Sequence, residues 1–323
     1  MRTLFWFLIV CTSFVNGQFD PTTHANWGLV NDEKCGLQPA LKIFGGENAR
    51  LGEFPWIVLV IADKKDRSTG EFIGGSMCGG SIISEHHVLT AAHCFTDAVH
   101  EYYNIRLIVG EYDWSKDPDC DSDDFCAPSF IELPASKVST HPDYQPHHPD
   151  KSYNPNSDIA VATVDPGFQF TDFVSPICLE YGELLGNKFA GEVAQVIGWG
   201  ASALVDNKTQ MPEILQKASL EVLDLESCRF STEGKKSTDQ EPAEQELMKP
   251  YLCAGAETQF SYAGDSGSPM FVAKSLNEDI PRQYQIGVFV QYFDANEVWK
   301  DGKRPHGYIR VGYYLEWILD QMS

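Results

Sequence analysis

Short runs of β-branched and aromatic residues recur along most of the chain, and Gly, Pro, Asn or Asp residues separate them. Such runs predict β-strands, because branched and aromatic side chains pack well on a pleated, half-buried surface. The predicted strands cover residues 56–62, 80–91, 104–110, 159–164, 193–199, 219–223, 269–273, 285–292 and 307–311. Many strands and few helices predict an all-β barrel or sandwich.

One helix is predicted, at the C-terminal end. Tyr314, Trp317 and Ile318 repeat there at the i, i+3, i+4 spacing of a helical face. Three polar stretches predict surface loops, and these are residues 113–127, 143–157 and 230–250.

The N-terminal pattern is different. Met1-Arg2-Thr3 precede the almost wholly apolar residues 4–10, and the small residue Gly17 closes the stretch. This order is typical of a secretory signal peptide, residues 1–17, with cleavage after Gly17. A membrane anchor is the alternative, but the apolar run is far shorter than the roughly 20 residues that span a bilayer. We therefore expect a secreted, extracellular and soluble protein.

Residues 18–42 show little apolar periodicity and end in Leu41-Lys42, just before Ile43-Phe44-Gly45-Gly46. They predict a short pro-segment, which leaves residues 43–323 as the main domain.

Cysteine usage agrees with export. Of the nine cysteines, Cys11 lies in the signal peptide, and the others are Cys35, Cys78, Cys94, Cys120, Cys126, Cys178, Cys228 and Cys253. An even number in an oxidising compartment predicts four disulfides and no free thiol. Spacing alone leaves about 105 pairings open. The absence of a C-x-x-C pair argues against structural zinc.

The formal net charge is −22, which makes nucleic acid and anionic membranes poor partners for the bulk surface. A solvated acidic exterior of a secreted protein explains the charge. Asn207-Lys208-Thr209 is the single acceptor sequence for an N-glycan, at Asn207.

The candidate chemistry centres on Gly264-Asp265-Ser266-Gly267-Ser268-Pro269. A serine between glycines suits a tight turn that exposes its hydroxyl and aims backbone N–H groups at one point. An ordinary surface turn uses the same residue types. A nucleophilic serine needs a base and an orienting acid, and the chain offers His93 in Thr90-Ala91-Ala92-His93-Cys94 and Asp158 at the head of a predicted strand.

His93, Asp158 and Ser266 occur in that order, each in a distinctive context, and here the chain resembles the trypsin and chymotrypsin family of serine proteases from about Cys35 to the C-terminus. Further matching motifs are Ile43-Phe44-Gly45-Gly46, Phe54-Pro55-Trp56, Cys78-Gly79-Gly80-Ser81, Asp158-Ile159-Ala160, Gly198-Trp199-Gly200 and Cys253-Ala254-Gly255. The resemblance implies two six-stranded antiparallel β-barrels with a C-terminal helix and catalytic groups at their junction.

The same resemblance implies a role for each residue. His93 is the general base, Asp158 orients it, and Ser266 attacks the scissile carbonyl, while the backbone N–H groups of Gly264 and Ser266 form the oxyanion hole. These roles need no metal or cofactor. The implied disulfides are Cys78 with Cys94, Cys228 with Cys253, Cys35 with Cys178, and, as the remaining pair, Cys120 with Cys126.

The insertion at residues 110–128 resembles the clip-domain proteases of arthropod haemolymph, which act in immune and melanisation cascades. A clip domain is not expected here, because residues 18–42 are too few and hold one cysteine. The resemblance implies protein substrates, an activating protease of basic specificity and a macromolecular inhibitor as partners, and we expect a monomer.

Activation is expected to follow cleavage after Lys42. The freed amine of Ile43 would then pair with Asp265 in a buried site and order the neighbouring oxyanion hole. A buried charge of this kind depends on its partner, and removal of one side typically costs about 3 to 5 kcal/mol. The pro-segment would stay attached through Cys35.

The substrate pocket departs from the family pattern. Phe260 stands six residues before the nucleophile, where trypsin-like members carry an aspartate, and Tyr292 and His306 replace small residues. If the alignment holds, all three point into the pocket and a long basic side chain does not fit; a shifted register is the alternative. Ser268 replaces a second glycine and would be strained if that position needs a positive φ.

Two further alternatives remain open. Glu111 stands where calcium-binding family members have a ligand, and acids follow it, but a solvated acidic loop explains them and is favoured over a structural calcium site. The competing function is a catalytically weak homologue that acts as a binding partner in a cascade. A lipase or esterase is excluded, because that fold orders its triad Ser, Asp/Glu, His.

Overall fold

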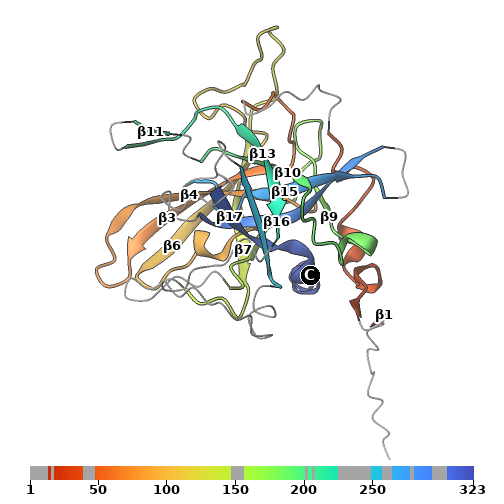
Figure 1. The fold of residues 1–323 in the computed structure, drawn as a ribbon. Coiled ribbons are helices and arrows are strands. Elements are labelled where there is room, and N and C mark those ends of the chain that lie inside the picture. The colour runs from red at the N-terminus through yellow and green to blue at the C-terminus, as the bar shows by residue number, and fades with distance from the viewer. Residues whose placement is uncertain are drawn as a thin grey trace, which may run out of the picture.

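Hydrogen bonds between strands close two six-stranded antiparallel barrels (Figure 1). The computed structural model describes residues 14–15, 18–38, 48–146, 156–200, 203–205, 208–224, 249–256, 264–276, 280–292 and 304–323. The first barrel runs in the order β3-β4-β5-β8-β7-β6. Its strands are β3 (Ile57–Asp66), β4 (Phe72–Ile82), β5 (His87–Thr90), β6 (His100–Val109), β7 (Ile131–Thr140) and β8 (Ala160–Val164).

The second barrel runs in the order β15-β10-β13-β14-β17-β16 and closes through the pairing of β15 with β16. The two-residue strand β9 (Cys178–Leu179) adds to β16 in parallel. The barrel strands are β10 (Val193–Gly198), β13 (Gln216–Leu223), β14 (Tyr251–Ala256), β15 (Pro269–Lys274), β16 (Arg282–Tyr292) and β17 (Arg304–Arg310).

Short elements complete the described chain. They are β1 (Phe14–Val15), β2 (Gln18–Phe19), η1 (Pro21–Thr23), η2 (Trp27–Leu29), η3 (Ala92–Cys94), η4 (Gly182–Leu184), β11 (Ala203–Val205), β12 (Lys208–Gln210), η6 (Val311–Tyr313) and α2 (Leu315–Asp320). The predicted C-terminal helix is therefore present but short, and Tyr314 is its N-cap. Within the described residues, no helix is long and apolar enough to cross a membrane.

The strands that the sequence predicts contain nearly continuous runs of buried residues. In β3, Val58, Val60 and Ala62 are at most 2% exposed, and Ile57 and Leu59 between them are 4% exposed. The single strand predicted over 80–91 was wrong, because the chain there finishes β4, turns, and forms β5. The first half of β4, and β7 and β14, were not predicted. The first is rich in glycine, β7 is largely exposed and contains a proline, and β14 ends in the small residues Ala254, Gly255 and Ala256.

Aromatic packing joins the two barrels. Trp56 and Phe54 of the first half meet Phe271 of β15 edge-on, with ring centroids 5.4 Å and 5.7 Å apart. Each such pair contributes about 0.5 to 1.5 kcal/mol beyond the area it buries. A buried hydrogen bond of 2.6 Å from the Ser81 hydroxyl to the Gln285 side chain also crosses the junction. These contacts fix the relative position of the two barrels, at whose junction the candidate catalytic residues lie.

Candidate active site

His93 lies in the single-turn helix η3, which begins two residues after the last residue of β5. Ala91 and Ala92 before it are fully buried, and their small side chains let the chain turn close to the barrel wall. The disulfide between Cys78 of β4 and Cys94 fixes the residue that follows. The backbone on both sides of His93 is therefore held rigidly.

Asp158 lies just before β8, is fully buried, and binds His93 twice. Its Oδ1 accepts the His93 backbone N–H at 2.8 Å, and its Oδ2 lies 2.7 Å from His93 Nδ1. Burial by itself lowers the pKa of the His93 imidazole, but the charge of Asp158 and the hydrogen bond to it outweigh that effect and raise the pKa above its ordinary 6.5. Since Nδ1 faces the carboxylate, Nε2 is the nitrogen that can take a proton from a nucleophile.

The loop that carries Ser266 packs against the segment leading to His93. Gly79 N–H donates to the Ser266 carbonyl oxygen at 2.7 Å, and Gly267 N–H donates to the Phe289 carbonyl at 2.8 Å. Gly267 has a φ of +82°, and a Cβ there would lie 2.2 Å from Thr90 Oγ1, so only glycine fits this close approach. Gly264 also has a positive φ, 103°.

The residues flanking the nucleophile are held in distinct ways. Asp265 Oδ1 accepts the N–H of Gly200 at 2.8 Å, and a Cβ at Gly198 or Gly200 would come within 2.2 to 2.3 Å of the Asp265 carboxylate. Ser268 is not among the described non-glycine residues with a positive φ, so the backbone strain that a positive φ would impose on a serine is absent there. Its side chain is buried against Gly79.

Two of the three candidate pocket residues face each other across paired strands. Tyr292 of β16 is opposite His306 of β17 in register, and His306 is opposite Ala254 of β14. The His306 side chain is only 4% exposed, and its ring centroid lies 6.1 Å from that of Phe289. His306 is therefore a buried residue of β17, the strand between β14 and β16. Phe260, the third candidate, lies outside the described residues, as do Lys42, Ile43, Asn207 and Cys228.

Three of the four implied disulfides are present, joining Cys35 with Cys178, Cys78 with Cys94, and Cys120 with Cys126. Cys253 is also disulfide-bonded.

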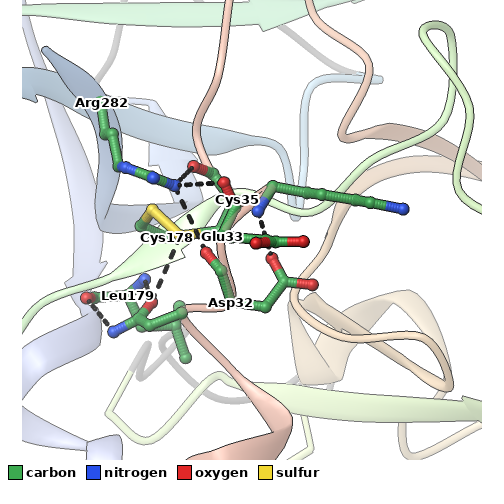
Figure 2. The surroundings of a disulfide bond; sticks show 8 residues. Asp32, Glu33, Cys35, Cys178, Leu179 and Arg282 are labelled. Carbon is green, nitrogen blue, oxygen red and sulfur yellow. Dashed lines mark hydrogen bonds between the residues drawn. A yellow bond between two sulfur atoms is a disulfide. The ribbon is translucent and has the colours of Figure 1, made fainter. Parts of the chain in front are cut away.

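The Cys35–Cys178 bridge is part of a larger junction between the N-terminal segment and the second barrel (Figure 2). The Arg282 guanidinium donates to the carbonyl oxygens of Cys35 and Glu33 at 2.9 Å and of Asp32 at 3.3 Å. Asn31 binds the backbone of Leu179 through both ends of its side-chain amide.

The acidic loop after β6 buries several carboxylates. Tyr112 N–H donates to both Glu111 Oε1 and Asp119 Oδ2, at 2.9 Å and 3.0 Å. Burial raises the pKa of Glu111 to about 7, with further contributions from the charges of Asp119, Asp117 and Asp113. In the described part of the chain, the one set of three potential ligand atoms within 4.8 Å of one another is Cys78, His93 and Cys94, whose sulfurs form a disulfide.

Comparisons with known proteins agree with this geometry. The sequence model of the trypsin family matches residues 43–318. The chain is 30% identical to CLIP domain-containing serine protease HP8 of Bombyx mori, over 91% of this chain and 73% of that protein. It is 31% identical to the Spaetzle-processing enzyme of Drosophila melanogaster, over 91% of this chain and 70% of that protein. The crystal structure of the Drosophila Grass clip serine protease of the Toll pathway superposes with a TM-score of 0.67 at 26% identity, covering 91% of this chain and 77% of that one.

Proposed function

Because the chain belongs to the trypsin family of serine proteases, we propose that it is a secreted serine endopeptidase, made as a zymogen and activated by cleavage after Lys42. The observation that carries the proposal is the pairing of His93 with the buried Asp158, with Nδ1 and Oδ2 2.7 Å apart, beside the glycine-bounded turn that presents Ser266. A histidine oriented by a buried carboxylate is the base that a serine hydroxyl needs.

The proposed reaction uses this chain's own groups. His93 Nε2 takes the proton of the Ser266 hydroxyl as its oxygen attacks the scissile carbonyl, and later gives a proton to the leaving amine. Asp158 stabilises the imidazolium that forms. The backbone N–H groups of Gly264 and Ser266 stabilise the oxyanion, and loss of one such donor typically costs about 2.7 to 4 kcal/mol.

Activation is proposed to act through Asp265. Its carboxylate binds Gly200 N–H next to the nucleophile turn, where a new amine at Ile43 could pair with it and hold the turn in its catalytic form. Asp265→Asn is expected to leave the protein zymogen-like after cleavage. The network around Cys35 and Arg282 supports the proposal that the N-terminal segment stays bound after the cut.

We propose a place in an extracellular immune or melanisation cascade, with protein substrates, an upstream protease of basic specificity and a macromolecular inhibitor. The name of one relative, Melanization protease 1 of Drosophila melanogaster, supports the cascade. Signal-peptide removal after Gly17, an N-glycan at Asn207 and a monomeric state belong to the same proposal.

One experiment tests the catalytic proposal. The protein is cleaved after Lys42, verified by N-terminal sequencing, and exposed to a fluorophosphonate probe, with Ser266→Ala as the control. Labelling of the wild type alone is expected. No labelling of the verified cleaved protein would reject catalysis.

The second candidate function is a catalytically weak homologue that binds within a cascade. One observation favours it, namely the burial of His306 between β14 and β16, opposite Tyr292. We propose that Phe260, Tyr292 and His306 close the primary pocket to long basic side chains. A peptide library cut by the active form should then lack Lys and Arg before the cleaved bond, and His306→Gly should admit larger side chains there. Efficient cleavage after arginine by the wild type would refute this.

A further inference from the structure

Two buried phenol hydroxyls from the second half of the chain hold the segment that leads into Asp158. The Tyr251 hydroxyl on β14 donates to Asn156 Oδ1. The Tyr314 hydroxyl, at the start of α2, lies 3.1 Å from Ser157 Oγ. Both tyrosines are at most 5% exposed. Asn156 and Ser157, the two residues immediately before Asp158, therefore each interact with a tyrosine hydroxyl from a different part of the fold.

The backbone at this point has an unusual conformation. Ser157 has a φ of 58°, a left-handed value that few residues other than glycine adopt without strain. Such a conformation persists only where surrounding contacts enforce it. Beyond the turn, Ile159 N–H donates to the Ser157 carbonyl at 2.8 Å and its own carbonyl accepts His141 N–H at 3.1 Å, so the chain enters β8 directly. The bond to Tyr314 is therefore placed where the backbone most needs support.

The position of this turn matters because Asp158 must accept two hydrogen bonds from His93 at once. An error of about 1 Å in a catalytic group can cost on the order of a hundredfold in rate. We propose that Tyr314 and Tyr251 are positioning residues, which act through Ser157 and Asn156 to hold the Asp158 carboxylate against His93. This inference rests on the proposed proteolytic function.

Burial keeps the hydroxyls of Tyr251 and Tyr314 protonated, and therefore able to donate hydrogen bonds, at neutral pH. Burial raises the pKa of Tyr314 above its ordinary 10.0, and burial together with the charges of Tyr314 and Asp158 raises that of Tyr251. His141 packs edge-on against Tyr314 at 5.0 Å, and burial lowers its pKa, while Asp143 lies 4.0 Å from its ring nitrogen. The phenols therefore stay protonated at neutral pH.

The first test is Tyr314→Phe, with Tyr313→Phe as the matched control, since Tyr313 adjoins it and is 53% exposed. Removal of the Tyr314 hydroxyl is expected to lower kcat about 5- to 20-fold with KM within twofold, because orientation and not substrate binding is lost. The pKa of His93, followed by NMR with His93→Gln to identify its signal, is expected to fall. Tyr251→Phe should act in the same direction, and Tyr313→Phe should change neither quantity.

The second test separates positioning from stability. Ser157→Gly removes the hydroxyl but adopts a positive φ without steric cost, so its melting temperature should stay near that of the wild type. Its kcat should nevertheless fall as in Tyr314→Phe, and the double variant should fall no further than either single one. A loss of activity that follows melting temperature, or additive losses in the double variant, would overturn the proposal.

The two hypotheses can fail separately. If the cleaved wild type is not labelled by the fluorophosphonate probe, the proposed function fails, but the His93 titration still tests the positioning. A lower His93 pKa in Tyr314→Phe supports the inference in that case. Identical titration curves for the wild type and Tyr314→Phe overturn it.

Discussion

Glu180 is a fully buried acid, and its environment makes the stability of the fold depend on pH. Its Oε1 accepts the N–H of Gly312 at 2.9 Å, and its Oε2 lies 3.6 Å from the Arg310 guanidinium. The same Arg310 nitrogen also donates to the carbonyls of Leu185 and Asn187, both at 2.8 Å. Because this cation is shared, it does not fully offset the cost of burying the carboxylate.

Burial outweighs the opposing effects of Arg310 and the Gly312 N–H, and raises the pKa of Glu180 from 4.5 to about 8. The folded state then binds this proton more tightly than the unfolded state. Stability from this group is fully present below pH 4.5 and is lost as the pH rises to about 8. At about 1.36 kcal/mol per pKa unit, the loss is on the order of 4 to 5 kcal/mol.

The perturbation is Glu180→Gln, which keeps the shape and cannot ionise. We expect wild type and variant to have similar unfolding free energies near pH 5 and the variant to be the more stable by several kcal/mol near pH 9. Urea unfolding at each pH measures this difference, and Glu183→Gln, an exposed neighbour, controls for the change in net charge. A constant difference from pH 5 to 9, or one of opposite sign, would refute the reasoning.

Three further predictions concern the site and its supports. Asp158→Asn should lower kcat by about 10⁴-fold and lower the pKa of His93, measured by probe labelling rates and NMR titration; an unchanged His93 titration would contradict the assigned pair. Gly267→Ala should lower the unfolding free energy by more than about 2 kcal/mol in chemical denaturation, because its Cβ would clash with Thr90, and a neutral effect would count against the close packing. Cys35→Ser should leave the pro-segment, residues 18–42, bound after cleavage under native conditions, which size exclusion followed by mass spectrometry can check; dissociation of the segment would show that the disulfide alone retains it.

Short sequence motifs pointed to the candidate catalytic residues, but not to the tyrosine contacts that hold the segment before Asp158. His93, Asp158 and Ser266 stand in local contexts that carry their own signals, such as the glycines around the serine and the small residues before the histidine. The tyrosine contacts carry no such signal. Ser157 and Tyr314 are 157 residues apart, and Tyr314 fits equally well as an ordinary apolar position of a helix.

The same distinction holds for the fold. Strands with runs of buried branched residues, such as the first half of β3, follow from their pattern. The glycine-rich first half of β4 does not, because glycine offers no side chain to pattern, and its place in the barrel is decided by pairing with β3. The junction at Arg282 is likewise invisible in sequence, since an arginine binding carbonyl oxygens about 250 positions away needs only backbone acceptors.

The His93–Asp158 pair and the candidate pocket residues come from different barrels, while the proposed nucleophile, Ser266, lies just before β15 of the second barrel. His93 and Asp158 come from the first barrel, and their contacts run through η3 and the head of β8. The candidate pocket residues Tyr292 and His306 lie opposite each other on β16 and β17 of the second barrel, and His306 is buried. A bulky residue there alters which side chain can enter without touching the hydrogen bonds of the dyad. An intact dyad and the proposed closure of the pocket are therefore compatible in physical terms.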